Sequence, residues 1–398
     1  MTYLLLILLL VFGCSPTEQE DVYGCTDENA YNFNENANVE DYSCGYCDEG
    51  YSSIIGNGYD YDYWDNGCYY NEDIEVIESF INNSLETINV ADMELNFDGI
   101  VQWYELGHQE WQDGRLIVFV SSFFYTNDLE TPYHSNLSGA IPENITNWEH
   151  IRDLYLGTLY SEDEINLEGN IDVLGELHSL EKLVVLNNSL SGTIPSTIYN
   201  LSNLQTLYLA RNSFEGQVSS DIVNLVNLKN LWLGDNNFNG ELPIELWEMN
   251  TLKSIELENN SLSGVIPNNI SNLSFLKRLV INNNNFSSEI PEEICNLDSL
   301  MDNLGLSIEW QDESVDYFNI SNNYFCPNNI TSEYPSCISD YIGEQNTDNC
   351  SNEGFYNLNI NQKISNYSNS KNYKNKSKNT LHNLNKKDSK RRAPLLIK

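Results

Sequence analysis

Apolar residues recur through the middle of the chain at the spacing L-x-x-L-x-L. Five stretches keep this pattern, LEKLVVLN, LQTLYLAR, LKNLWLGD, LKSIELEN and LKRLVINN. Each leads to an asparagine, and these lie 24 residues apart, at Asn188, Asn212, Asn236, Asn260 and Asn284. Alternate leucines of a short strand point to one side, so a single unit cannot bury its apolar face alone. A fixed period of this length therefore predicts a stacked solenoid.

The polar and special residues of the period are expected to belong to the scaffold. Each asparagine falls where the chain turns inside the coil, where its amide would satisfy buried backbone groups that otherwise cost about 1–3 kcal/mol each. Glycine allows close backbone approach, and proline stiffens the outer arc. They recur at Gly192, Gly216, Gly240 and Gly264, and at Pro195, Pro243, Pro267 and Pro291. We interpret these residues as structural, not catalytic.

The repeats fade towards both ends of the chain. IRDLYLGT (151–158) opens a degenerate copy and NLSGAIP closes an earlier one, while FNISNNYF (318–325) reads as a last strand after an insertion near 301–317. Before them, apolar residues at helical spacing in 71–85 predict a short amphipathic helix. A first strand is expected from Leu116 to Val120. The helix and the stretch QWYELGHQEWQDGRL are expected to cover the N-terminal end of the solenoid.

The combined pattern L-x-x-L-x-L-x-x-N-x-L-S-G-x-I-P resembles the plant-type leucine-rich repeat. The resemblance implies an α/β solenoid: a horseshoe with a parallel β-sheet on its concave face, short 3-10 or irregular segments outside, and here a small disulfide-rich N-terminal segment. We expect the following organisation: signal peptide 1–13, Cys/Asp/Asn-rich segment 14–70, N-terminal cap 71–115, repeats 116–325, C-terminal cap 326–350 and a basic disordered tail 351–398.

Eight of the nine cysteines form two groups of four, which predicts disulfides in an exported chain. They are Cys25, Cys44, Cys47 and Cys68, then Cys295, Cys326, Cys337 and Cys350. Each group allows three pairings, and metal-spaced histidines that would favour zinc are lacking. Residues 325–350 resemble the cysteine-bearing C-terminal cap of bacterial repeat proteins. We prefer the pairings Cys295 with Cys326 and Cys337 with Cys350.

The chain starts with an apolar run, Leu4 to Phe12, that fits a signal peptide and is too short to span a bilayer. The run ends in VFGC, which resembles a bacterial lipobox and implies lipidation of Cys14. The n-region lacks Lys and Arg, and an ordinary signal peptide with an incidental cysteine is the alternative. The acids after Cys14 resemble the tract that sends some Bacteroidetes lipoproteins to the cell surface. We therefore expect an exported protein, lipid-anchored to the outer membrane or surface of a bacterium.

Residues 24–44, GCTDENAYNFNENANVEDYSC, resemble a short Cys-bounded motif of secreted proteins from marine Bacteroidetes and related bacteria. Oxygen ligands at alternate positions are what a hard cation such as calcium needs. The candidate ligands are Asp27, Asn32, Asn34 and Asn36. The segment lacks a D-x-D-x-D-G loop, so a disulfide-closed loop with Asn-driven turns remains the alternative.

The net charge of -40 is unevenly distributed. Residues 351–398 hold 11 of the 19 Lys and Arg, so residues 1–350 carry 8 basic and 57 acidic groups. A body this acidic repels nucleic acid and anionic lipid, and plain solubility is the alternative reading of its charge. The basic tail lacks an apolar period and is expected to be disordered, without a specific function.

Catalysis is poorly supported by the sequence. The five histidines are scattered, and the motifs H-E-x-x-H, G-x-S-x-G and G-x-x-x-x-G-K-[ST] do not occur. No acid pair of the glycosidase type stands out. We expect no enzymatic activity and no cofactor, with calcium as the one candidate ion.

The better candidate site is the outward column of the predicted strands, which reads Tyr155, Val184, Tyr208, Trp232, Glu256 and Val280. Aromatic residues and arginine are preferred interface anchors, and aromatic rings also stack on sugars. Cross-strand packing without a ligand is the alternative. We predict a non-catalytic protein that presents this concave face to a protein or glycan. The expected contacts are Tyr155, Tyr208, Arg211, Trp232, Asp235, Glu256 and Arg278; a structural or adhesive surface component with calcium-binding acidic regions is the other hypothesis.

Overall fold

The structure is a computed structural model of the 398-residue chain. It describes residues 22–26, 30, 36–40, 45–52, 68–88, 101–121, 135–157, 167–304, 307–310, 313–328, 333–347 and 350. The predicted signal peptide, Cys14, Cys44, the candidate calcium ligands Asp27, Asn32 and Asn34, and the tail 351–398 lie outside these residues. Asn36, the remaining candidate ligand, is an exposed turn residue.

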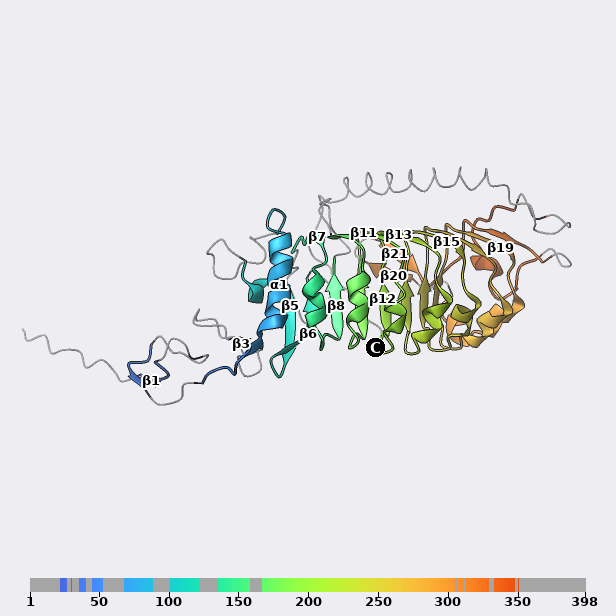
Figure 1. Ribbon diagram of the computed structural model, residues 1–398. Coiled ribbons are helices and arrows are strands. Elements are labelled where there is room, and N and C mark those ends of the chain that lie inside the picture. The colour runs from blue at the N-terminus through green and yellow to red at the C-terminus, as the bar shows by residue number, and fades with distance from the viewer. Residues whose placement is uncertain are drawn as a thin grey trace, which may run out of the picture.

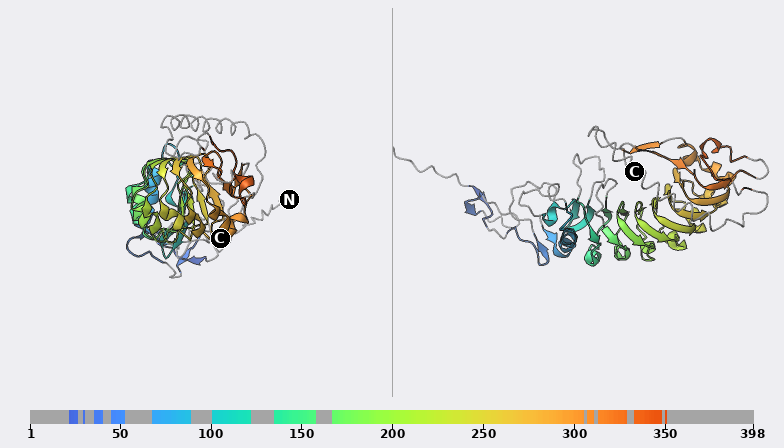
Figure 2. Two further views of the ribbon diagram at one scale, coloured as in Figure 1. Left: turned by 90° about the vertical axis from the view of Figure 1, so that its right-hand side faces the viewer. Right: turned by 90° about the horizontal axis from the view of Figure 1, so that it is seen from above.

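The concave side of the coil is a nine-stranded sheet, which confirms the predicted solenoid (Figures 1 and 2). All pairs are parallel except β5 with β6 at the N-terminal edge. In spatial order the strands are β5 (His108–Gln112), β6 (Arg115–Val120), β8 (Asp153–Leu156), β10 (Lys182–Val185), β12 (Thr206–Tyr208), β14 (Asn230–Trp232), β16 (Ser254–Glu256), β18 (Arg278–Val280) and β22 (Phe318–Asn319).

A second sheet of eight strands and a series of 3-10 turns complete each coil. The strands are β7 (Gly139–Ala140), β9 (Leu167–Gly169), β11 (Ser189–Gly192), β13 (Ser213–Gly216), β15 (Asn237–Glu241), β17 (Ser261–Gly264), β19 (Asn285–Glu289) and β23 (Tyr324–Cys326). The 3-10 turns lie on the convex side (Figure 2), at Glu143–Asn147, Asp172–Glu176, Ile198–Asn200, Ser220–Asn224, Ile244–Glu248, Asn268–Asn272 and Glu292–Asn296.

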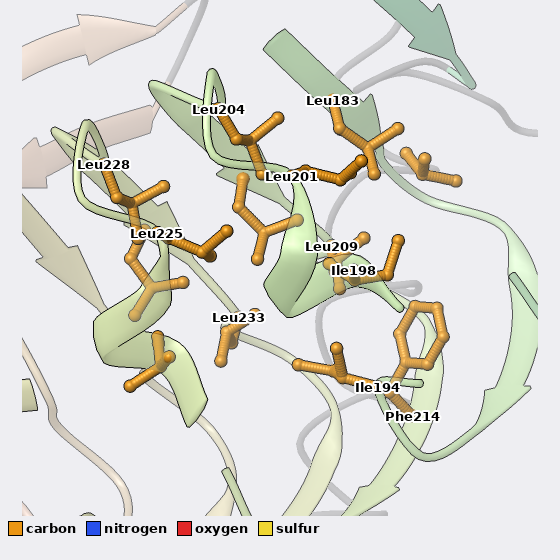
Figure 3. Close-up of a cluster of buried hydrophobic side chains, with 14 of the residues drawn as sticks. Leu183, Ile194, Ile198, Leu201, Leu204, Leu209, Phe214, Leu225, Leu228 and Leu233 are labelled. Carbon is orange, nitrogen blue, oxygen red and sulfur yellow. The ribbon is translucent and has the colours of Figure 1, made fainter. Parts of the chain in front are cut away.

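The hydrophobic core runs through the inside of the coil. Figure 3 shows leucines from the concave strands facing residues of the 3-10 turns, with Leu209 and Leu233 opposite Ile198 and Leu225. All four side chains are fully buried. Because each coil contributes the same positions, the core continues from one repeat to the next, and this is why a single repeat could not fold alone.

The asparagine after each concave strand ties neighbouring turns together. The Asn236 side chain donates to the carbonyls of Leu209 (2.9 Å) and Leu233 (3.1 Å) and accepts from the amide of Phe214 (2.9 Å). Asn188, Asn212, Asn260, Asn284 and Asn323 repeat this arrangement. These asparagines therefore satisfy buried backbone groups, as the sequence predicted, and belong to the scaffold.

The helix α1 (Asn71–Asn83) covers the N-terminal end of the coil and burial of its apolar stripe confirms the predicted amphipathic helix. Its fully buried Asp73 accepts from the Arg115 guanidinium at 2.8 and 3.1 Å and from the amide of Leu116 at 3.0 Å. The Trp148 indole donates to the Asp73 carbonyl at 2.9 Å. The helix is thus fixed to β6 and to the first 3-10 turn by a buried polar network, in addition to apolar packing.

The disulfides at the C-terminal end differ from the preferred pairing. Cys295 pairs with Cys337 and Cys326 with Cys350, with Cα–Cα distances of 5.7 and 5.6 Å. The predicted pairings, Cys295 with Cys326 and Cys337 with Cys350, are therefore wrong. Cys295 lies in a convex 3-10 turn whereas Cys326 ends β23 in the second sheet, so the two are on different sides of the coil and each bonds to the cap chain that passes it.

The remaining described elements lie outside the repeats. In the N-terminal segment Cys47 is bonded to Cys68, and Cys25 is also in a disulfide; β1 (Tyr23–Gly24) pairs with β2 (Val39–Glu40) and β3 (Tyr51–Ser52) with β4 (Tyr69–Tyr70). The insertion near 301–317 contains α3 (Asp298–Met301) at its start and a hairpin of β20 (Ser307–Trp310) and β21 (Glu313–Asp316). The hairpin reaches over the concave side of the coil (Figure 2).

Candidate functional site

The outward residues of the concave strands form one continuous row. The strand register places Tyr155 beside Val184, then Tyr208, Trp232, Glu256 and Val280 in succession. Neighbouring parallel strands are about 4.8 Å apart, so adjacent members of the row are close enough to touch. The repeat period alone predicted this row.

The N-terminal half of the row is apolar and buried. A cluster separate from the inner core consists of Val118, Val120, Tyr155, Val184, Leu186 and Ala210. Tyr155 is only 8% exposed, and burial raises the pKa of its phenol. Lys182, beside it, donates to Asp153 at 2.6 Å. Tyr155, one of the predicted ligand contacts, therefore packs within this apolar cluster.

The centre of the row is an aromatic pair at the edge of that cluster. The rings of Tyr208 and Trp232 meet edge to face with centroids 5.5 Å apart, and both side chains are half-buried. The Trp232 indole donates to Glu258 Oε1 at 2.8 Å. A Cβ atom at Gly234 would overlap the Glu258 carboxyl group. The absence of a side chain at Gly234 is therefore what lets Glu258 lie back against Trp232.

The C-terminal half of the row is built on a buried ion pair. Arg278 contacts Glu256 at 3.0 Å, and the two residues are only 8% and 7% exposed. Ser254 donates to Glu256 at 2.7 Å, and the Arg278 guanidinium lies 5.7 Å from the centroid of the Tyr317 ring. Burial raises the pKa of Glu256, and Arg278 opposes that rise. The pair carries opposite charges out of water, which is tolerable only because each charge has its partner.

Two polar atoms at this end are buried without a hydrogen-bond partner: Glu258 Oε2 and Arg278 Nε. Burial, followed by repulsion from Glu256 and Asp235, raises the pKa of Glu258 to about 8. At neutral pH this carboxyl group is therefore largely protonated and can donate a hydrogen bond as well as accept one. Unused hydrogen-bonding capacity in a buried position calls for an explanation, and a bound ligand would supply the missing partner.

Arg211 and Asp235 follow the strands and form a rim beside the row. Both have left-handed backbone conformations, with φ of 59° and 53°. Arg211 contacts Asp235 at 3.7 Å, Asn259 donates to Asp235 at 2.9 Å, and Asn283 donates to Asn259 at 2.7 Å. These polar side chains thus connect neighbouring turns, which gives Arg211 and Asp235 a structural task besides any contact with a ligand.

The structure brings together four of the seven predicted contacts, Tyr208, Trp232, Glu256 and Arg278. Tyr155 lies in the apolar half, and Arg211 and Asp235 lie on the rim. Two residues that shape this site, Gly234 and Glu258, were not among the predicted contacts. The available signal was a glycine exactly one repeat before a glutamate at the same repeat position, since position 258 follows 234 by one period of 24 residues.

Within the described ranges, no group of three or more His, Cys, Asp or Glu side chains is arranged to hold a metal ion. The same part of the chain contains no helix that is both long and apolar enough to cross a membrane.

The chain was compared with known proteins. Residues 179–201, 203–225, 227–249, 251–273 and 275–297 match the family profile of the leucine-rich repeat. These five segments coincide with the five stretches of fixed period, and each contains one concave strand and one 3-10 turn. Among curated proteins, no match was found.

Solved structures with similar chains include a TDR receptor (30% identity over 47% of this chain and 33% of that chain, TM-score 0.41). Others are the Arabidopsis receptor kinase HAESA in complex with the peptide hormone IDA and a co-receptor (24%, 53% and 37%, TM-score 0.42) and a leucine-rich repeat protein of Leptospira interrogans (26%, 49% and 55%, TM-score 0.36). The chain spans between a third and about half of the length of these three. Residues 179–297 are thus five consecutive leucine-rich repeats, and they form the centre of a leucine-rich repeat solenoid.

Proposed function

We propose that this protein is a non-catalytic binding protein, and that its ligand is a protein or glycan segment held at the C-terminal half of the concave row. One observation carries the proposal. The partly exposed rings of Tyr208 and Trp232 meet edge to face on the concave sheet, and the Trp232 indole donates to Glu258, whose Oε2 lacks a hydrogen-bond partner. A ligand stacked on the rings would lie next to this carboxyl group, and a small shift of the Glu258 side chain would let it take up the missing hydrogen bond.

The chemistry of these residues suits recognition. Tyr, Trp and Arg are the side chains that most often carry binding energy at interfaces. Trp232 is held by its bond to Glu258 and Arg278 by its bond to Glu256, so both are ordered before a ligand arrives. Ordering them in advance lowers the entropy cost of association.

The same geometry makes the acids of this face poor general bases. Glu256 is buried and is engaged by both Arg278 and Ser254. Glu258 is engaged by Trp232 and is largely protonated at neutral pH. A general base needs an ionised carboxylate within reach of the substrate proton, and neither residue offers one.

We further propose that the protein is exported and anchored at a bacterial surface through lipid on Cys14. The disulfides Cys47–Cys68, Cys295–Cys337 and Cys326–Cys350 support export, because such bonds persist in oxidising compartments. In a detergent-partition assay, Cys14→Ser is expected to move the protein from the membrane fraction to the soluble fraction. A variant that stayed in the membrane fraction would place the anchor elsewhere.

The binding proposal is tested with the full chain on a glycan array and in a pull-down of exported proteins, followed by titration of the ligand found. Trp232→Ala is expected to weaken binding about thirtyfold or more, since anchor residues cost about 2 kcal/mol or more on truncation. Because the variant also loses the hydrogen bond to Glu258, binding is compared at temperatures where both proteins are folded.

Tyr341→Ala is the matched control, because Tyr341 is an aromatic residue that is 40% exposed in the C-terminal cap, away from the concave row. It should bind as the unmodified protein does. If Trp232→Ala binds every identified ligand as tightly as the control, the concave row is not the binding site.

A further inference from the structure

Basic side chains are rare in the acidic body, and most of them are engaged. Of the eight in residues 1–350, Arg115, Lys182, Arg211 and Arg278 form ion pairs and Lys229 donates to Gln205. Only Arg152, Lys253 and Lys277 make neither an ion pair nor a side-chain hydrogen bond within the part of the chain that the structure describes.

These three cations occupy the same position of the repeat, directly before the concave strand. Backbone hydrogen bonds join this position from coil to coil: Glu181 to Arg152 (2.8 Å), Gln205 to Glu181 (2.7 Å), Lys229 to Gln205 (2.8 Å), Lys253 to Lys229 (2.7 Å) and Lys277 to Lys253 (2.8 Å). The C-terminal end of this column is thus three lysines on successive coils, which we name the lysine row: Lys229, Lys253 and Lys277.

A large apolar side chain lies beside the lysine row. Phe275 is 60% exposed and stands two residues before Lys277. In earlier coils its position holds Asn203, Asn227 or Thr251, and each of these donates a hydrogen bond to a carbonyl of the preceding coil (3.1, 2.8 and 2.7 Å). Phe275 thus replaces a structural hydrogen bond with an exposed ring, which places an apolar surface beside the lysine row.

We propose that the lysine row and Phe275 bind a linear anionic polysaccharide with one carboxylate or sulfate group per sugar. Lysines on successive coils, whose backbones are about 4.8 Å apart, present a continuous line of positive charge to a linear polyanion. Their long side chains can follow the spacing of its acidic groups. The Phe275 ring offers an apolar face on which a sugar ring stacks.

This surface is separate from the proposed ligand site at Tyr208 and Trp232. Those residues point out of the concave sheet, whereas the lysine row precedes the strands. Phe275 directly precedes Leu276, the first leucine of its repeat, and thus also lies before the start of β18 at Arg278. The inference therefore does not depend on the concave row, and each surface can fail its test without affecting the other.

The acidic charge of the remaining surface leads to two expectations, one about where the polysaccharide binds and one about how salt affects its affinity. Residues 1–350 carry 57 acidic and only 8 basic groups and repel an anionic polymer wherever cations are absent, so on this part of the chain binding should be confined to the row. Contacts between exposed charges are screened by salt, with a Debye length of about 10 Å at 0.1 M. Affinity should therefore fall steeply as salt is added.

The test is a calorimetric titration of the full chain with short oligogalacturonate at low ionic strength. A sulfated oligosaccharide, the methyl-esterified and hence uncharged oligogalacturonate, and poly-glutamate are run beside it. Binding of the first or second probe is expected, without binding of the uncharged one. The double substitution Lys253→Gln/Lys277→Gln should weaken binding on the order of tenfold, since each exposed ion pair is worth up to about fivefold at low salt.

Two single substitutions make the test specific. Phe275→Asn restores the side chain found in earlier coils, so it should keep the fold while weakening binding by about threefold or more, as expected for one lost stacking contact. Arg152→Gln removes an unpaired cation from the far end of the same column and should change the affinity by less than about twofold.

Carbodiimide coupling of the bound oligogalacturonate, followed by peptide mapping, locates the contact directly. Cross-links at Lys253 and Lys277 are expected. The proposal is overturned if neither anionic oligosaccharide binds, if the double variant binds as the unmodified chain does (as it would if the basic tail 351–398 were responsible), or if poly-glutamate binds better than the oligosaccharides.

Discussion

In the N-terminal half of the concave face the outward residues are Val118, Val120, Tyr155 and Val184, which pack together as a buried apolar cluster. In the C-terminal half the equivalent positions hold the Glu256–Arg278 pair, and Glu258 lies beside them. The strands of both halves keep the same parallel register. At the repeat position of Tyr155 and Val184 the chain thus replaces apolar residues by Glu256. The position of Arg278 carries charge in both halves, since Asp153 and Lys182 form an ion pair there.

The difference follows from which positions the fold constrains. Inward apolar residues recur in both halves, and the asparagine follows every concave strand from β10 to β22, because these coils need them to satisfy buried backbone groups and fill the core. The outward positions carry no such requirement. They are the part of each repeat that is available for recognition, and they carry different side chains in the two halves.

The largest expected loss of stability comes from placing a charged residue of the C-terminal half at the equivalent apolar position of the N-terminal half. Val184→Glu places at the buried apolar position the residue that position 256 carries three coils later. Without an Arg278 to pair with, the carboxylate should cost about 3–5 kcal/mol of unfolding free energy at neutral pH. Denaturant unfolding measures the loss, and Val184→Leu is the control for a change of size alone. A loss below that of the control would mean that the N-terminal half admits water.

Breaking the charged half from within should have the next largest effect. Arg278→Met leaves Glu256 buried without its partner, at a cost of about 3 kcal/mol. The double substitution Glu256→Met/Arg278→Met removes both charges and should recover most of that stability. The loss in the single variant should also shrink in acid, where Glu256 takes up a proton. If the double variant is as unstable as the single one, packing rather than charge explains the cost.

Much of this fold could be predicted from the sequence, because the repeat period records its physical constraints directly. Inward leucines, the turn asparagine and helix α1 each follow from a local pattern, and the structure places them as expected. Pairing of the C-terminal cysteines did not follow. It depends on which side of the last coil each cysteine occupies, and Cys295 and Cys326 lie on different sides.

The candidate site could be predicted only in outline. The period places Tyr208, Trp232 and Glu256 in one row, but it does not say how far a neighbour covers each of them. Burial of Glu256 depends on the length of the Arg278 side chain, and the position of Glu258 depends on the missing side chain of Gly234. The lysine row, by contrast, could have been predicted from the sequence, because Lys229, Lys253 and Lys277 each follow the first leucine of a repeat.

A moderate loss of stability is expected when one of the scaffold asparagines is removed. Asn236→Ala removes the bonds to Leu209, Leu233 and Phe214 and leaves those backbone groups unpaired, at a cost of about 1–3 kcal/mol. Thermal unfolding measures it, with the exposed Asn239→Ala as the control. Ligand binding should be unchanged at temperatures where the variant is folded. A variant that melts normally but no longer binds would make Asn236 a recognition residue.

The smallest effect, and the sharpest probe of the charged half, is the pH dependence due to Glu258. The pKa of this group is raised to about 8 in the folded protein, chiefly by burial, against about 4.3 in an unfolded chain. Between these two values the folded state holds a proton that the unfolded chain has released. Folding stability from this group should therefore be fully retained below the lower value and fall as the pH rises towards 8.

Glu258→Gln removes the titrating group while keeping an acceptor for the Trp232 indole. Its melting temperature is expected to fall less than that of the unmodified protein between pH 5 and pH 8, and the two curves should converge below about pH 4.3. The difference should be smaller than the full pKa shift implies, because part of the Glu258 side chain is exposed and solvent screens its charge. Glu215→Gln, an exposed change in β13, should follow the unmodified curve. If Glu258→Gln does so too, the Glu258 carboxylate is already ionised in the folded protein, and the C-terminal half is better hydrated than its burial implies.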